Sequence, residues 1–288
     1  MTAVFLALVS SLFFAAATVA IHRGILKMDY LSGLLVNLLT NALFLWIFLG
    51  LFFRTADLWV SANLIFVGVG FVVPGLPRLF MFKGVERLGA SISSMLINSI
   101  PLFAILIAVV FLKERPSLTN LLGAFSIVAG VVCICWRGDA KTWRILDLLF
   151  PLAGAFLFAL RDNVVRFGLL ITASPVMGAT IVSTTSAVTA ATLYFSTSGT
   201  KGLAGADRSG LGWFSLSGFL CFLSYISMFT ALNLERVSVV TPLASCSSLF
   251  TPLFAFFLLR EEDPITPRKV TAMVLVVLGV FLIAWEKM

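Results

Sequence analysis

Charged residues are scarce in this sequence. Asp, Glu, Lys and Arg make up only 11% of the 288 residues, whereas apolar residues make up 60% and the mean hydropathy is +1.09. A water-soluble protein has about 25% charged residues, most of them on its surface. The shortage excludes a soluble enzyme, and the long apolar runs along the whole chain indicate an integral membrane protein.

Residues that bind metals or form disulfides are also few. The chain has one histidine, His22, and four cysteines, all of which fall inside apolar runs. A structural zinc site needs about four ligands at recognisable spacing, and the sequence contains no such set. We therefore expect no metal and no cofactor, and we interpret the cysteines as packing residues.

Basic residues outnumber acidic ones, 20 against 13, but they form no continuous basic tract. They stand singly or in small groups at the ends of apolar runs, which is typical of residues that set membrane topology. The expected surroundings are therefore a lipid bilayer, and we expect no nucleic acid as a partner.

The apolar runs predict ten membrane-spanning helices. About 20 helical residues cross a hydrocarbon core of about 30 Å. Charges, prolines and glycines mark the ends of ten apolar runs of about this length. The short connections leave no room for a catalytic domain outside the membrane. We expect an all-α integral membrane protein that is not an enzyme. The predicted spans are 3–21, 31–53, 59–82, 89–112, 118–136, 144–166, 172–196, 211–233, 237–259 and 268–285.

The two halves of the sequence are related to each other. Glu86-Arg87 recurs as Glu235-Arg236, 149 residues later. Between the two halves Pro101-Leu102-Phe103-Ala104 also recurs, as Pro252-Leu253-Phe254-Ala255. Because each copy holds five spans, an odd number, the second copy enters the membrane from the opposite side. The sequence therefore predicts two inverted five-helix repeats.

We expect the first repeat to be residues 1–139 and the second to be residues 140–288. Two inverted halves can exchange conformations, which gives two states of similar energy around a site between them. The chain has no Gly-x-x-x-x-Gly-Lys-Ser/Thr loop for ATP. The pattern favours a secondary transporter of a small-molecule substrate, for which a monomer could suffice.

Several motifs resemble a known family. Phe-Leu-Lys-Glu-Arg-Pro at 111–116, followed by Gly-Ala-Phe-Ser-Ile-Val-Ala-Gly-Val at 123–131, is similar to EamA-type members of the drug/metabolite transporter superfamily. Leu-Leu-Arg-Glu-Glu at 258–262 and Val-Leu-Val-Val-Leu-Gly-Val at 274–280 are similar in the second half. The resemblance implies a ten-helix permease or exporter in a bacterial inner membrane. Members of this family are associated with amino acids, nucleobases, nucleotide sugars and drugs.

The third predicted span is interrupted by Pro74, Gly75 and Pro77. Each proline removes a backbone donor, and unpaired carbonyls at membrane depth are tolerated only beside a cavity or other protein. We therefore predict a broken helix. Arg78 follows directly, and two interpretations stay open: its guanidinium binds a substrate anion, or it reaches the interface near Lys83.

Asp162 is the acidic residue that the sequence places deepest in the membrane. It belongs to Arg161-Asp162-Asn163, at the end of an apolar run, and precedes Arg166 by four residues. The favoured interpretation is a helix-stabilising pair between Asp162 and Arg166. The alternative is proton coupling, because a carboxylate in the membrane can bind and release protons.

Polar residues at helical spacing complete the candidates for substrate binding. Inside membranes such groups more often join neighbouring helices by hydrogen bonds, which is the alternative for each of them. Ser227 lies 149 residues after Arg78, so it could complete a central site. The candidates are Asn37, Asn41, Ser94, Asn98, Tyr225, Ser227 and Ser248.

Two other functions stay open at the level of the sequence. A lipid flippase would share most of these features, and so would a membrane protein that does not transport, although the inverted repeat favours transport. A membrane-embedded enzyme would need clusters of acids, bases, nucleophiles or metal ligands within the spans. The sequence contains no such cluster.

Overall fold

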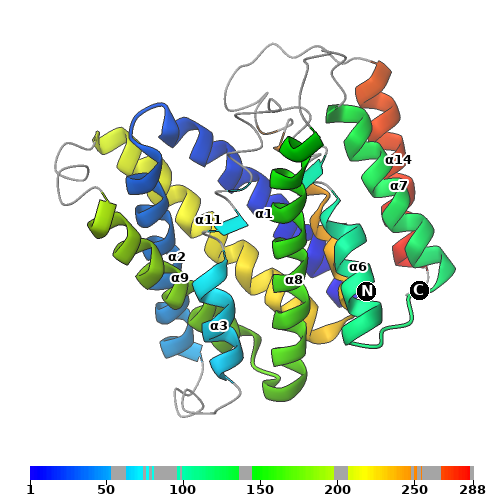
Figure 1. The fold of residues 1–288 in the computed structure, drawn as a ribbon, viewed down its shortest axis with the longest axis horizontal. Helices are drawn as coiled ribbons and strands as arrows, with labels where there is room; N and C mark the ends of the chain where they lie inside the picture. The colour runs from blue at the N-terminus through cyan, green and yellow to red at the C-terminus, as the bar shows by residue number, and fades with distance from the viewer. Residues whose placement is uncertain are drawn as a thin grey trace.

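Helices make up the regular structure of the described part of the chain (Figure 1). This computed structural model describes residues 1–52, 63–73, 76–77, 80, 96–97, 99–135, 145–197, 207–247, 250–251, 254 and 267–285. The first-half helices are α1 (Thr2–Ile25), α2 (Tyr30–Phe52), α3 (Leu64–Val72), α6 (Ile100–Phe111) and α7 (Leu118–Cys135). The second-half helices are α8 (Leu149–Thr172), α9 (Pro175–Thr197), α11 (Arg208–Leu234), α12 (Val237–Ala244) and α14 (Pro267–Trp285).

Five helices of the described residues are long and apolar enough to cross a membrane: α1, α2, α8, α9 and α11. The helix α6 and the apolar parts of α7 and α14 are shorter. The predicted all-α, multi-pass membrane protein is confirmed. Five of the ten predicted spans correspond to full-length helices in these ranges.

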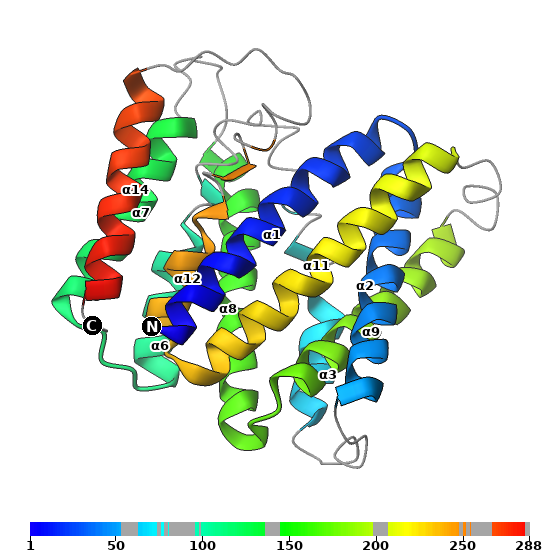
Figure 2. The same cartoon turned by 180° about the vertical axis from the view of Figure 1, so that it is seen from behind.

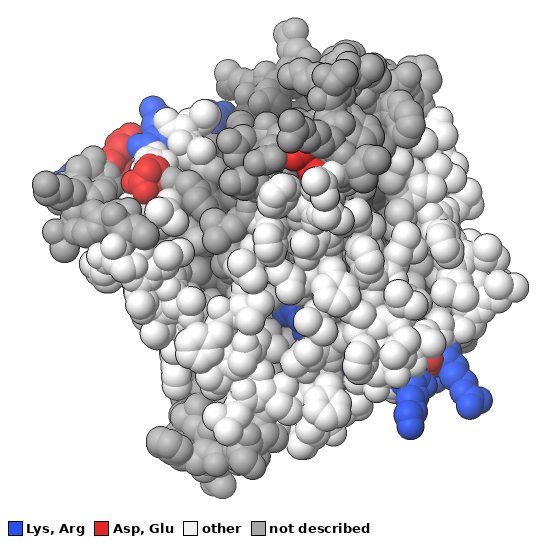
Figure 3. Space-filling model, in the orientation of Figure 1, with Lys and Arg blue, Asp and Glu red and all other residues white. Residues whose placement is uncertain are grey.

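Apolar side chains cover the outside of the bundle. Phe111 is 76% exposed, Leu51 73% and Phe5 66%. Figure 3 shows that charged side chains on one face gather mainly towards opposite ends of the molecule, with a broad and largely uncharged band between them that is interrupted by basic atoms near its centre. Lipid tails, unlike water, solvate such a surface without cost, so the band corresponds to the hydrocarbon depth of the bilayer.

The helices α2 and α9 lie side by side and run in opposite directions. Near the start of α2, the hydroxyl of Ser32 donates to Tyr194, late in α9. Further along α2, the indole N–H of Trp46 donates to Thr184, earlier in α9, at 2.9 Å. At successive contacts the residue number rises along α2 and falls along α9, so the two helices are antiparallel.

The helices α7 and α14 form a second antiparallel pair, at one edge of the molecule in both Figures 1 and 2. Ser126 Oγ donates to the Leu275 carbonyl at 2.6 Å, and the two residues are 149 positions apart. A Cβ on Gly279 would lie only 2.6 Å from the Gly123 carbonyl oxygen, so glycine is needed for this close approach. Equivalent helices packed antiparallel are what two inverted copies would produce.

Contacts between the halves follow the same correspondence. The first helix, α1, packs against α11 and α12, and its counterpart α8 packs against α3 and α6. Where these helices meet, Ala7, Ala159, Ala231 and Val240 are all completely buried. Small side chains let membrane helices approach closely, and the candidate site lies at this crossing.

Candidate functional site

A group of polar residues stands near the midpoint of α8. Arg161, Asp162 and Asn163 follow an apolar run in the sequence, and the predicted span ended at residue 166, whereas α8 continues to Thr172. At a rise of 1.5 Å per residue the group lies about 18 Å from the start of the helix. It therefore occupies the middle of the span.

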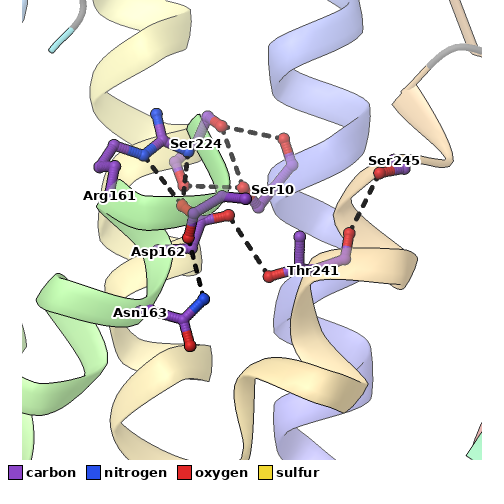
Figure 4. Close-up of polar contacts among 8 residues, drawn as sticks. Ser10, Arg161, Asp162, Asn163, Ser224, Thr241 and Ser245 are labelled. Carbon is purple, nitrogen blue, oxygen red and sulfur yellow. Dashed lines mark hydrogen bonds and ion pairs between the residues drawn. The ribbon is translucent and has the colours of Figure 1, made fainter. Parts of the chain in front are cut away.

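Asp162 forms a buried ion pair with its neighbour in the chain. The Nε and Nη2 atoms of Arg161 both donate to Asp162 Oδ1, at 2.9 and 2.7 Å. Thr241 of α12 donates from Oγ1 to the other carboxylate oxygen at 3.3 Å (Figure 4). Asp162 is only 2% exposed, and a charge buried at this depth is stable only when it is paired.

The predicted pair between Asp162 and Arg166 is wrong. Arg166 Nη1 instead donates to the carbonyls of Leu232 and Asn233, the latter at 2.8 Å. These carbonyls belong to the last turn of α11, where no later N–H of the same helix is available to them. A long-range partner therefore displaces the local pair expected from helical spacing.

The helices α1 and α11 are joined next to this ion pair. Ser10 Oγ donates to the Ser224 carbonyl at 2.9 Å, and Ser224 Oγ donates to the Ser10 carbonyl at 3.0 Å (Figure 4). Both residues are 4% exposed. The adjacent residue, Tyr225, lies close enough to Arg161 to interact with its guanidinium. The crossing of α1 and α11 thus holds a phenol against the guanidinium.

Aromatic rings complete the surroundings of Arg161. The guanidinium carbon lies 5.4 Å from the centre of the Phe158 ring, within the range of a cation–π contact. The ring of Tyr225 stacks on Phe229, with centroids 5.8 Å apart and an interplanar angle of 20°. Arg161 is therefore fixed by an acid, a phenol and an aromatic face, which leaves its orientation well defined.

Asn163 has an unused acceptor beside this pair. Its Nδ2 donates to the carbonyls of Ala104 at 3.1 Å and Ala159 at 2.9 Å. Its Oδ1 is buried and has no hydrogen-bond partner among the described residues. A buried unpaired acceptor is rare, so this oxygen is a natural contact for a ligand or a bound water.

Of the other predicted residues, Asn37 joins two helices. Its Nδ2 donates to Ser217 Oγ on α11 at 2.7 Å, and the residue is 2% exposed. Asn41 is 1% exposed, and its Oδ1 lacks a partner in the described ranges. Ser227 donates to Leu223 in its own helix. Of the predicted binding and coupling residues that the structure describes, Asp162 and Tyr225 are the ones that lie together, on either side of Arg161.

The helix α3 ends where the prolines begin. Its last residue is Val72, and Val73 is extended, with φ −119° and ψ 134°. The hydroxyl of Ser186 in α9 lies 3.1 Å from the Gly70 carbonyl oxygen and 2.6 Å from that of Val73.

These two carbonyls are four residues before Pro74 and Pro77, whose missing N–H groups cannot reach them. Ser186 therefore replaces the lost donors. The carbonyl of Pro77 itself lies against α8, 3.1 Å from where a Cβ on Gly154 would be. The remaining predicted residues lie outside the described residues: Pro74, Gly75, Arg78, Ser94, Asn98 and Ser248.

Sequence reasoning missed most of the residues around Asp162. Arg161 and Asn163 carried a usable signal, because three consecutive polar residues inside a long apolar helix need partners. Ser10, Ser224 and Thr241 carried none, since single hydroxyl residues are common in membrane helices. Within the described ranges, no group of three or more His, Cys, Asp or Glu side chains could hold a metal ion.

Comparisons with known proteins agree with this architecture. A solved structure described as "Crystal structure of protein" superimposes with a TM-score of 0.77 at 14% identity, covering 99% of this chain and 96% of its own, and so shares the fold. No curated protein matches. Two stretches, residues 1–136 and 145–285, each match the EamA-like transporter family, whose members are transporters and not enzymes. The chain therefore belongs to the EamA-like transporter family and is an integral membrane transporter of the drug/metabolite transporter superfamily.

Proposed function

We propose that this protein is a secondary permease or exporter of a small zwitterionic or anionic metabolite, such as an amino acid, in a bacterial inner membrane. It works by alternating access between two inverted repeats. The observation that carries the proposal is the buried pair of Arg161 and Asp162 at the midpoint of α8. Paired charges at this depth are costly, and they typically mark substrate or ion pathways.

The pair suits a substrate that carries both charges. A substrate carboxylate replaces Asp162 at the guanidinium of Arg161, whose side chain is 20% exposed, and the substrate ammonium donates a hydrogen bond to the carbonyl oxygen of the protonated Asp162. The unpaired Oδ1 of Asn163 offers the ammonium a further acceptor. Arg78, which follows the broken third helix in the sequence, is a second candidate for the substrate anion.

Asp162 also serves as the proton-coupling residue. When its carboxylate takes up a proton it loses most of its attraction for Arg161, so the guanidinium becomes available to an anion. When the substrate leaves, the ion pair forms again and the proton is released. One proton is thereby bound and released together with each substrate carboxylate, so proton and substrate move in the same direction.

The two antiparallel pairs of equivalent helices support the rocking step. In the pair of α7 and α14, a Cβ on Gly123 would lie 2.8 Å from the Gly279 carbonyl oxygen, and a Cβ on Gly279 would lie 2.6 Å from that of Gly123, so the two backbones approach closely. Close contacts at small residues allow packed helices to shift by small amounts. The central site then faces each side of the membrane in turn, and one chain forms the whole pathway.

Exchange in proteoliposomes tests the proposal. Vesicles loaded with a mixed pool of amino acids, nucleobases, organic acids and sugar phosphates are analysed by mass spectrometry for the compounds that leave. We expect wild type and a control at the exposed start of α11, Arg208→Gln, to release one zwitterionic or anionic class. The Asp162→Asn variant, with correct folding shown by gel filtration, should bind that class but lose the dependence of its transport on a proton gradient.

Two results would contradict the proposal. If labelled phospholipid crosses the bilayer and no metabolite does, the protein is a lipid flippase. If neither a metabolite nor phospholipid moves under any ion gradient, the purified protein does not transport, and the pair of Arg161 and Asp162 is structural.

A further inference from the structure

A cavity of about 300 Å³ opens where α6 and α8 end and α12 begins, away from the central pair. Its lining is strongly basic, and Figure 3 shows basic side chains gathered at this end of the molecule. The charged side chains that line it are Lys113, Glu114, Arg115, Arg166 and Arg236. Four cations therefore share the cavity with one carboxylate.

That carboxylate is already occupied by other donors. Glu114 Oε1 accepts from the backbone N–H of Val237 at 3.0 Å, and Oε2 accepts from the backbone N–H and the hydroxyl of Ser238, at 3.1 and 2.8 Å. Glu114 thus caps the first turn of α12. A second acid beside the cavity, Glu235, accepts from the backbone N–H of Arg236 at 3.1 Å. Even with both acids counted, the cations are in excess.

The arginines are held in place by backbone carbonyls. Arg236 Nη1 donates to the Arg115 carbonyl at 3.0 Å, and Arg166 Nη1 donates to the end of α11. Among the described residues the guanidinium groups of Arg166 and Arg236 are each anchored through one nitrogen, so most of their N–H donors stay available. Arg166 is attracted by Glu114 and Glu235 and repelled by Arg236. Fixed like charges of this kind attract a counter-ion.

Lys113 occupies a position that favours glycine. Its φ is 53°, in the left-handed region, and the N–H groups of Leu112 and Glu114 both bond the Ala108 carbonyl, at 3.0 and 3.1 Å. Glycine is the usual residue at such a helix end because it has no Cβ. The sequence has lysine instead, which places an ammonium group at the cavity.

We propose that this cavity binds a phosphate group at the membrane boundary, in addition to the transport function. A phosphate dianion matches the excess of positive charge, and its oxygens match the planar fork of arginine. The remaining lining residues, Leu112 and Leu170, are apolar, and Leu170 is 59% exposed. A phosphorylated solute carries such a dianion, and the headgroup of an anionic phospholipid presents a singly charged phosphodiester with the same kind of oxygens.

Thermal unfolding of the purified full chain in detergent tests the site with inorganic phosphate, against chloride at equal ionic strength. We expect phosphate to stabilise wild type and Lys27→Gln, a control at the exposed turn between α1 and α2. Arg236→Gln and Lys113→Gly should each bind phosphate about tenfold more weakly. Lys113→Gly also relieves the left-handed turn, so its loss of binding cannot be ascribed to poorer folding.

A second measurement distinguishes the source of the phosphate. Native mass spectrometry counts phosphatidylglycerol and phosphatidylcholine retained by wild type and by the same variants. Preferential, variant-sensitive retention of phosphatidylglycerol indicates a headgroup site, and a response to inorganic phosphate alone indicates a soluble ligand. If neither probe distinguishes wild type from Arg236→Gln and Lys113→Gly, the proposal is wrong. Asp162→Asn should bind phosphate normally, so failure of the transport proposal would be visible separately.

Discussion

Two groups of charges in this protein are balanced in opposite ways. At the midpoint of α8, Arg161 and Asp162 neutralise each other, and both carboxylate oxygens have a donor. In the cavity where α6 ends, four cations surround Glu114, whose oxygens are used by α12. Charges in the hydrocarbon must be paired inside the protein, whereas charges at the boundary can rely on water or on a ligand.

The largest expected effect is removal of the central acid. Asp162→Ala leaves the half-buried Arg161 without its partner at the midpoint of the span, and breaking a buried pair costs about 3–5 kcal/mol. Thermal unfolding in detergent should therefore show a large loss of stability. The double variant Arg161→Leu/Asp162→Ala should recover much of it. Equal stability of wild type and Asp162→Ala would show that water reaches the pair. The central charges and the charges of the cavity would then not differ in their need for a partner inside the protein.

Removing a neutral hydrogen-bonding partner in the membrane should also lower the stability of the protein, but by less than removing a charged one. Ser186→Ala removes the donor for the carbonyls of Gly70 and Val73. Leaving buried carbonyls unpaired costs about 1–3 kcal/mol. The control, Ser196→Ala, removes an exposed hydroxyl that bonds only Leu193 within its own helix. The same measurement should separate the two variants, and an equal response would mean that another donor reaches the broken helix.

The acid at the boundary should matter less than the acid in the centre. Glu114→Gln keeps the shape of the side chain but removes the charge that caps α12, at a cost of about 0.5–1 kcal/mol. We also expect tighter phosphate binding, because one negative charge leaves the cavity. Isothermal titration with phosphate measures this second effect, and weaker binding would show that Glu114 positions the arginines.

The smallest expected effect has the opposite sign. Lys113→Gly fits the left-handed turn better and should stabilise the protein by about 0.5–1 kcal/mol in the absence of phosphate. Lys113→Ala, which removes the same charge but keeps a Cβ, should not stabilise it. Thermal unfolding of both variants compares backbone strain with charge at one position. A gain in Lys113→Ala equal to that in Lys113→Gly would assign the effect to charge repulsion.

The membrane class, the related halves and the end of α3 just before Pro74 could all be predicted from the sequence. Bilayer thickness sets the length of an apolar run, and a proline removes its own N–H wherever it stands. Both constraints act along the chain, so a local pattern reveals them. The polar triple in α8 was also visible, although its place at mid-helix was not.

Partners far apart in the chain were decided only by the tertiary structure. The pair of Asp162 and Arg166 predicted from helical spacing is absent because the end of α11 supplies free carbonyls to Arg166. The donor for the broken helix comes from Ser186, more than a hundred residues away. Hydrophobic pattern determined that helices form and cross the membrane, but each buried polar group took the best partner in space, and that partner depends on how the helices pack.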